Sequence, residues 1–176
     1  MKKSIITLII SLFLASLASA QGTKQCFGDG VGNICPCLNN NNSSGSRGNA
    51  AGCANSATLA GCNLDAAGGS NSVAADDLVL CFDDAPPNVP GILYCGTIRL
   101  AAPFGDGIRC CGGNVRRIDL IFSDASGAGC STVGIASTSG QGAGDTGCYQ
   151  YWYRDPAGPC FQSFNLSNAY KVLWTP

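Results

Sequence analysis

The chain has 176 residues, 12% of them charged, with a net charge of −1 at pH 7 and no histidine. This mild balance excludes the clustered basic face of a typical nucleic-acid-binding domain. The missing imidazole excludes Ser-His-Asp and Cys-His catalysis, which depend on a histidine base. Every acidic residue is an aspartate, and Asp, Asn and Gly favour turns over helices.

Residues 1–20 are typical of a secretory signal peptide. Lys2 and Lys3 supply the positive start, an apolar run follows, and small residues at 18–20 provide the cleavage motif. No later apolar run approaches the roughly 18 residues that cross a bilayer. We therefore expect a mature chain that begins at Gln21, has no membrane span, and is secreted to the extracellular space or held at the cell surface.

Residues 21–56 form a segment rich in Gly, Asn and Cys and poor in apolar side chains. It contains Phe27-Gly28-Asp29-Gly30, Cys35-Pro36-Cys37 and a polar run at 39–42. Such a composition is typical of irregular loops. Because the segment has little apolar surface to bury, we expect an irregular N-terminal arm that is held in place by its cysteines.

Residues 57–176 read as short strands separated by Gly, Pro and Asp clusters. Residues 117–122, for example, place Ile118, Leu120 and Phe122 on one face, as half-buried strands do. No long helical pattern separates the strands, so we predict an all-β fold: a single disulfide-stapled antiparallel β-sandwich domain behind the Cys-rich arm. The expected strands are 57–63, 72–75, 77–82, 91–100, 117–122, 132–137, 148–154 and 169–175.

The run from Cys148 to Cys160 is the densest cluster of aromatic rings in the chain. Alternation puts its three tyrosines on one face and Gln150, Trp152 and Arg154 on the other. Large rings usually pack in cores, but only one face of a strand can lie inside. Exposed rings beside polar groups can bind sugars, which gives five candidate ligand-binding residues: Tyr149, Tyr151, Trp152, Tyr153 and Asp145.

Twelve cysteines follow residue 20. An even number in an exported chain indicates disulfides, and the lack of histidine and of any Cys-x-x-Cys pair argues against a zinc site. We therefore predict no metal held by cysteine and up to six disulfides that pair all twelve residues. They are Cys26, Cys35, Cys37, Cys53, Cys62, Cys81, Cys95, Cys110, Cys111, Cys130, Cys148 and Cys160.

One disulfide can be predicted individually. The segment 83–90 carries three prolines and cannot continue the strands on either side of it. If the chain folds back there as a hairpin, Cys81 and Cys95 face each other at a distance that a disulfide can close. We therefore predict a Cys81–Cys95 pair.

The remaining candidates for a chemical function are the aspartates, as catalytic groups, and a bound metal ion. Paired carboxylates could act as acid and base in a glycosidase, and Asp76-Asp77, Asp83-Asp84 and Asp145 are the candidates. Their commoner use is to cap turns and strand ends. Calcium binding is left open, because an Asp/Asn/Gly-rich domain offers oxygen ligands. The residue spacing of a helix-loop-helix calcium site is absent. No other cofactor is expected.

Several longer motifs resemble an uncharacterised family of secreted, Cys-bearing domains common in planctomycetes and myxobacteria. The resemblance covers nearly all of the mature chain and implies no catalytic residue. It implies cysteines at 26, 35, 37, 53, 110 and 160, which leaves the other six as additions. The motifs are Ala75-Asp76-Asp77-Leu78-Val79-Leu80, Pro86-Pro87-Asn88-Val89-Pro90, Pro103-Phe104-Gly105-Asp106-Gly107-Ile108-Arg109-Cys110, Gly112-Gly113-Asn114-Val115-Arg116-Arg117, Trp152-Tyr153-Arg154-Asp155-Pro156-Ala157-Gly158-Pro159-Cys160 and Phe164-Asn165-Leu166-Ser167-Asn168-Ala169.

Two functions are compatible with these features. The favoured hypothesis is a secreted, non-catalytic domain that binds an extracellular glycan or surface protein, or that builds extracellular material. The alternative is a small secreted hydrolase that uses aspartates to cleave polysaccharide. Neither hypothesis involves nucleic acid.

Overall fold

The computed structural model describes residues 21–42 and 50–176, so the signal peptide expected over residues 1–20 lies outside it. The described chain is nearly all β, as predicted, and no helix in it is long and apolar enough to cross a membrane. Its elements are β1 (Thr23–Gln25), β2 (Asn63–Gly68), β3 (Val79–Asp83), β4 (Pro90–Gly96), β5 (Ile98–Phe104), β6 (Gly107–Gly112), β7 (Arg116–Phe122), β8 (Gly129–Cys130), α1 (Ile135–Ser139), β9 (Thr146–Arg154) and β10 (Phe164–Leu173).

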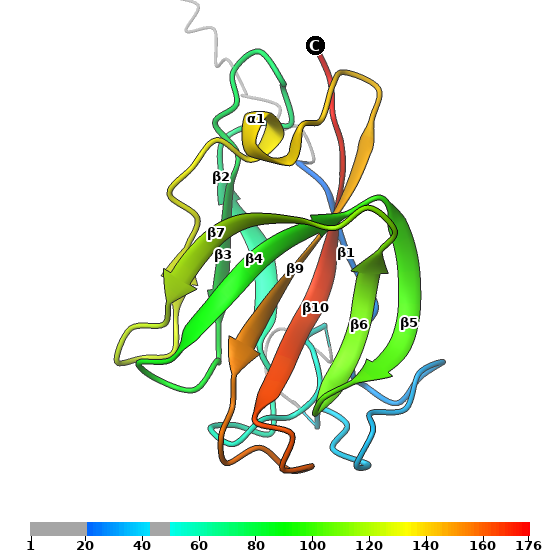
Figure 1. Cartoon of the computed structure of the whole chain (residues 1–176), viewed down its shortest axis with the longest axis vertical. Coiled ribbons are helices and arrows are strands. Elements are labelled where there is room, and N and C mark those ends of the chain that lie inside the picture. The colour runs from blue at the N-terminus through cyan, green and yellow to red at the C-terminus, as the bar shows by residue number, and fades with distance from the viewer. Residues whose placement is uncertain (1–20, 43–49) are drawn as a thin grey trace, which may run out of the picture.

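The strands form three antiparallel sheets (Figure 1). The largest has five strands in the order β1-β10-β9-β4-β7, and a smaller one has three in the order β2-β3-β8. The third is the β5-β6 hairpin, which lies against β10 and β9. Every pairing between these strands is antiparallel, so the predicted antiparallel arrangement is confirmed.

The main core lies between the five-stranded and three-stranded sheets. Leu80 and Phe82 of β3 pack there with Leu93 of β4 and Tyr151 of β9. The rings of Phe82 and Tyr151 stack with centroids 3.7 Å apart. Burying these large side chains provides most of the free energy that holds the two sheets together.

A second core lies on the other side of the five-stranded sheet, under the β5-β6 hairpin and the N-terminal arm. Tyr94 of β4, Ile108 of β6 and Leu166 of β10 meet there with six disulfide-bonded cysteines of the arm, the hairpin and β9. Strands β4, β9 and β10 are therefore covered on both faces over part of their length. The edge strand β7 is not, and its Leu120 and Phe122 are each 63% exposed.

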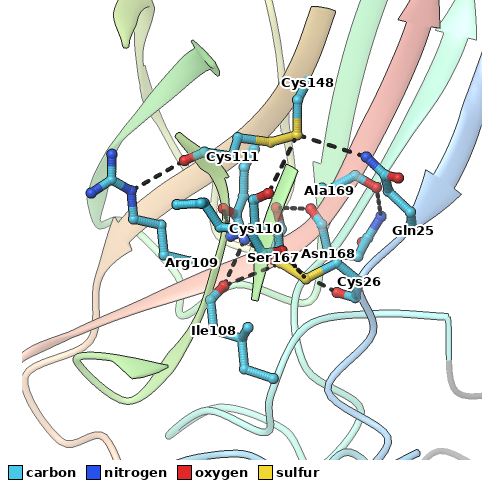
Figure 2. The surroundings of a disulfide bond; sticks show 12 residues. Gln25, Cys26, Ile108, Arg109, Cys110, Cys111, Cys148, Ser167, Asn168 and Ala169 are labelled. Carbon is cyan, nitrogen blue, oxygen red and sulfur yellow. Dashed lines mark hydrogen bonds between the residues drawn. A yellow bond between two sulfur atoms is a disulfide. The ribbon is translucent and has the colours of Figure 1, made fainter. Parts of the chain in front are cut away.

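Five disulfides connect these layers. Two of them tie the arm to the rest of the chain and one closes a loop within the arm, so the expectation that cysteines hold the arm is confirmed. Figure 2 shows two bonds next to each other, where the adjacent residues Cys110 and Cys111 fasten β6 to the arm and to β9. The pairs are Cys26–Cys110, Cys35–Cys53, Cys37–Cys160, Cys81–Cys130 and Cys111–Cys148.

The predicted Cys81–Cys95 bond is wrong. The proline-rich segment does not turn the chain back as a hairpin, because it carries the chain from β3 in one sheet to β4 in the other. Cys81 therefore bonds to its register partner on β8, Cys130. Cys95 and Cys62 are buried and free, so the prediction that all twelve cysteines pair is also wrong.

Four of the expected strands differ from the observed elements. Residues 72–75 form a turn, with a single bridge at Ser72. Residues 57–63 form turns and enter a strand only at Asn63, and residues 91–100 are divided between β4 and β5 at Thr97. Residues 132–137 lead into the helix α1 instead of a strand. The helix depends on a distant cap, because the carboxylate of Asp76 accepts hydrogen bonds from the backbone N–H groups of Ala136 and Ser137.

The two free cysteines lead to a first prediction. Burial raises the pKa of both thiols, and for Cys62 the charges of two nearby aspartates add to the effect. Because the thiolate is the reactive form, the folded protein should not react with Ellman's reagent at neutral pH. Unfolding in denaturant without reductant should expose two thiols per chain.

A Cys62→Ser, Cys95→Ser double variant is the control and should give no thiol signal in either state. No signal from the denatured, unreduced wild type would mean that these two residues form a sixth bond and that the pairing above is incomplete.

Candidate functional site

The tyrosine face of β9 lies inside the main core, and the predicted alternation of this strand is confirmed. Tyr149 and Tyr151 are fully buried and Tyr153 is 1% exposed. Their hydroxyl groups are occupied: that of Tyr151 donates to the Ile121 carbonyl oxygen, 2.8 Å away, and that of Tyr149 accepts from the Trp174 indole. The three tyrosines are therefore core residues with almost no exposed surface in the folded protein.

The opposite face of β9 points away from the main core, and its three side chains have different environments. Gln150 is buried under the hairpin, Trp152 is partly exposed, and Arg154 is exposed. Trp152 therefore lies at the edge of the region of the five-stranded sheet that the β5-β6 hairpin covers. Of the predicted ligand-binding rings, it is the one that solvent reaches.

Two other rings fix the position of Trp152. Phe104, at the end of β5, and Phe164, at the start of β10, each lie with their centroid 5.6 Å from that of Trp152. Phe104 and Phe164 also contact each other, at 4.9 Å. Tilted and edge-on contacts of this kind are favourable and restrict ring rotation, so the indole is held in one orientation on the surface of the sheet.

A groove runs over Trp152 on this surface. It consists of two adjoining cavities of about 300 and 190 Å³ that share Ile92 and Trp152 as their floor. Strand register explains the floor, because Leu120 of β7, Ile92 of β4 and Trp152 of β9 are neighbours in one cross-strand row. The remaining lining residues are Pro90, Gly91, Tyr94, Phe104, Arg109, Val115, Arg117, Tyr153, Arg154, Phe164 and Leu166.

Among the described residues of this lining, the charged ones are all arginines. Arg117 and Arg154 are exposed and Arg109 is partly buried. The Arg109 Nε donates to the Cys111 carbonyl oxygen at 3.1 Å, as Figure 2 shows, and its guanidinium lies 5.9 Å above the Phe104 ring. The disulfides of the two residues that follow Arg109 hold its backbone in place, so this guanidinium is pre-positioned.

Buried polar groups support the groove from below. The Tyr94 hydroxyl donates to the Gln150 side-chain oxygen, 2.5 Å away, and the same oxygen accepts from the Cys110 backbone N–H at 2.9 Å. Burial raises the pKa of Tyr94 well above its usual value, and the positive charge of Arg109 offsets part of that rise. The phenol therefore stays protonated and continues to donate to Gln150.

Asp145, the fifth predicted ligand residue, lies in a different place. It lines a separate polar cavity of about 420 Å³ with Arg116 and Thr146, and its carboxylate accepts from the Gly142 backbone N–H. Because it precedes Trp152 by seven residues in an extended segment, the two lie roughly 23 Å apart. The structure does not bring Asp145 and Trp152 into one site.

The aspartates proposed as catalytic pairs have structural partners. Asp76 caps α1, and hydrogen bonds from Ser70 lower the pKa of Asp77. A general acid needs the opposite shift. Burial raises the pKa of Asp106, and its charged neighbour Asp155 adds to the effect, but both side chains have no exposed surface.

In the described part of the chain, no three metal-ligating side chains of the Asp, Glu, Cys or His type are grouped to hold a metal ion. No such group therefore supports the calcium site that the sequence left open. Comparison with known proteins also adds none: no family model, no curated protein and no solved structure matches this chain.

The sequence identified Trp152 and missed the rest of the groove. Phe104, Arg109, Arg117 and Phe164 lie in motifs that carry the family resemblance. Nothing in their spacing indicates that they surround one ring, because their strands become neighbours only through pairing over long sequence distances.

Proposed function

We propose that this protein is a secreted, non-catalytic extracellular domain that binds a glycan in the Trp152 groove. In this proposal the two sheets around the main core make a small β-sandwich, and the chain belongs to the uncharacterised family of secreted domains that its motifs resemble. The single observation that carries the proposal is the position of Trp152, partly exposed on a groove floor and fixed by two further rings.

The chemistry of the groove suits a sugar. Its floor is apolar, which favours the C–H face of a pyranose ring, and guanidinium groups at its margins can donate hydrogen bonds to hydroxyl groups. An open groove, unlike an enclosed pocket, accepts a chain that continues beyond the bound residues. Five disulfides are compatible with export to an oxidising compartment, where such a ligand would be met.

The rival proposal, an aspartate-dependent hydrolase, has less support. No carboxylate is among the described residues that line the groove, and Asp76, Asp77 and Asp145 accept backbone N–H groups in caps and turns. The release of reducing ends from a polysaccharide panel, abolished by an Asp→Asn change in one of these residues, would favour the hydrolase over the binding domain.

Replacing the central ring should remove binding. Truncation of a central aromatic contact typically costs about 2 kcal/mol, or roughly 30-fold in affinity. We expect Trp152→Ala to lose about that much affinity for the glycan that an array of cell-surface polysaccharides selects with the wild type. The measurement is a titration followed by calorimetry.

Tryptophan fluorescence provides an independent readout, because the second tryptophan, Trp174, is 1% exposed and buried in the core. Ligand should change the emission of the wild type and not that of Trp152→Phe. Leu173→Ala removes another exposed apolar side chain outside the groove and should bind normally. Equal affinity in Trp152→Ala and wild type would place the ligand elsewhere and contradict the proposal.

A further inference from the structure

The groove differs in charge from the chain that forms it. The whole chain contains 11 acidic residues and has a net charge of −1. Among the described residues that line the two cavities, three are arginines and none is acidic. Positive charge is therefore concentrated at the surface where the Trp152 ring is presented.

No carboxylate of the described residues neutralises these arginines. The one salt bridge in the described part of the chain joins Lys24 of β1 to Asp65 of β2. Arg109, Arg117 and Arg154 thus have no acidic oxygen within salt-bridge distance. Guanidinium groups left unpaired beside low-dielectric apolar walls concentrate a positive potential in the groove.

The arrangement of the arginines suits a chain and not a single small anion. Arg117 pairs with Tyr94 in register, and Arg154 lies opposite Phe164, so the two are on opposite sides of the row that contains Trp152. Two strand spacings across the sheet and four residues along it separate their Cα atoms by roughly 16 Å. Arg109 projects from the hairpin into the cavity that also contains Arg117.

From this arrangement we propose that the groove selects an acidic polysaccharide. Its carboxylate or sulfate groups bind Arg109 and Arg117 at one end and Arg154 at the other, and a sugar ring between them stacks on Trp152. A planar guanidinium can donate two parallel hydrogen bonds to either kind of anion. This inference rests on the proposed function and names the class of glycan.

The experiment compares polymers that differ in charge and source of charge. Calorimetric titration of the full mature chain with dextran sulfate and with dextran compares a sulfated and a neutral form of one backbone, and polygalacturonate supplies carboxylates. We expect binding to one or both anionic polymers, at least roughly tenfold tighter than to dextran, and weaker as salt is raised. Which anionic polymer binds better identifies the anion.

Charge-removing variants test the site itself. Arg117→Gln with Arg154→Gln should weaken anionic binding at least roughly tenfold and reduce its salt dependence. Both side chains are exposed, so the fold should be unaffected. Arg99→Gln, at an exposed arginine of β5 outside the groove, is the matched control and should bind as the wild type does.

The outcomes separate the two proposals. Binding of a neutral glycan that needs Trp152 but is unaffected by the arginine variants would overturn the acidic inference and leave the proposed function intact. An equal loss in Arg99→Gln and in the groove variants would also overturn it, because attraction would then come from overall charge. Failure to bind any polymer or glycan would overturn both proposals.

Discussion

Replacing Gln150 by Leu should destabilise the protein by about 4 kcal/mol, because it leaves buried polar groups without partners. The Gln150 side chain is fully buried, and its oxygen accepts from Tyr94 and from the Cys110 backbone N–H. Its amide nitrogen donates to the carbonyl oxygens of Ile108 and Ser167, at 2.9 and 2.7 Å. Both acceptor sites and both donor hydrogens of the amide are therefore used.

This glutamine connects three elements with one side chain. It holds β6 of the hairpin and the middle of β10 to β9. Leucine has a similar size and could fill the space, but each orphaned group would still lose its partner at a cost of about 1–3 kcal/mol. A loss of about 4 kcal/mol corresponds to a melting temperature lower by roughly 10 °C for a domain of this size.

The measurement is thermal unfolding followed by circular dichroism under non-reducing conditions. Gln162→Leu makes the same change at an exposed glutamine and should leave the melting temperature unchanged. Adding Tyr94→Phe to Gln150→Leu removes one of the orphaned groups, so the double variant should lose less stability than the two single losses combined. A Gln150→Leu protein as stable as the wild type would show that this network contributes nothing.

The sequence predicted features that depend on neighbouring residues along the chain. The period-two alternation of 148–154 was sufficient to place the three tyrosines on one face, and the structure confirms it. A tight turn at Phe104-Gly105-Asp106-Gly107 is a second local feature, with Gly105 at a φ of 60° between the paired residues Phe104 and Gly107. Such features are local because a strand's alternation and a two-residue turn need no distant partner.

Alternation alone could not decide which face of β9 is inside. Both faces carry large rings, and the outcome depends on what covers each of them. The tyrosine face meets β3, whose Phe82 stacks on Tyr151. The other face is covered by a hairpin that contacts Trp152 through Phe104 and leaves the indole partly exposed. Neither cover is adjacent in sequence, so the exposed ring could be identified only from the structure.

The failed Cys81–Cys95 prediction has the same origin. Consecutive strands joined by a short segment often pair, and the prediction assumed that β3 and β4 do so. They instead belong to opposite sheets, and Cys81 finds Cys130 on β8. A proline-rich connection ends the preceding strand whether the chain then forms a hairpin or crosses to another sheet. Its composition therefore does not distinguish the two.

Replacing Gly52 by Ala should destabilise the protein by about 3 kcal/mol, at the upper end of the usual range for overpacking. Gly52 is buried where the N-terminal arm meets β10. A Cβ atom on Gly52 would lie 2.2 Å from the Leu166 carbonyl oxygen and 2.8 Å from the Ser167 carbonyl carbon. Both are backbone atoms, so no side chain can rotate away to relieve the clash.

The surroundings of Gly52 also resist movement. Its N–H donates to the Cys62 carbonyl oxygen at 2.9 Å, and the next residue, Cys53, is bonded to Cys35. On the other side, Ser167 lies at an irregularity of β10 where Gln150 donates to its carbonyl oxygen and its hydroxyl accepts from the Tyr151 backbone N–H. Neither backbone can shift without breaking bonds that are themselves buried.

Gly68 offers a matched control for Gly52→Ala. A Cβ atom there would meet nothing within 4 Å, and the φ angle is not in the left-handed region. Gly68→Ala should therefore keep the melting temperature or raise it slightly, because alanine reduces the freedom of the unfolded chain. Gly52→Ala should lower it by roughly 6–12 °C. If the two variants have the same melting temperature, Gly52 does not contact the backbone of β10 as it does in the structure. The disulfides would then anchor the arm without this contact.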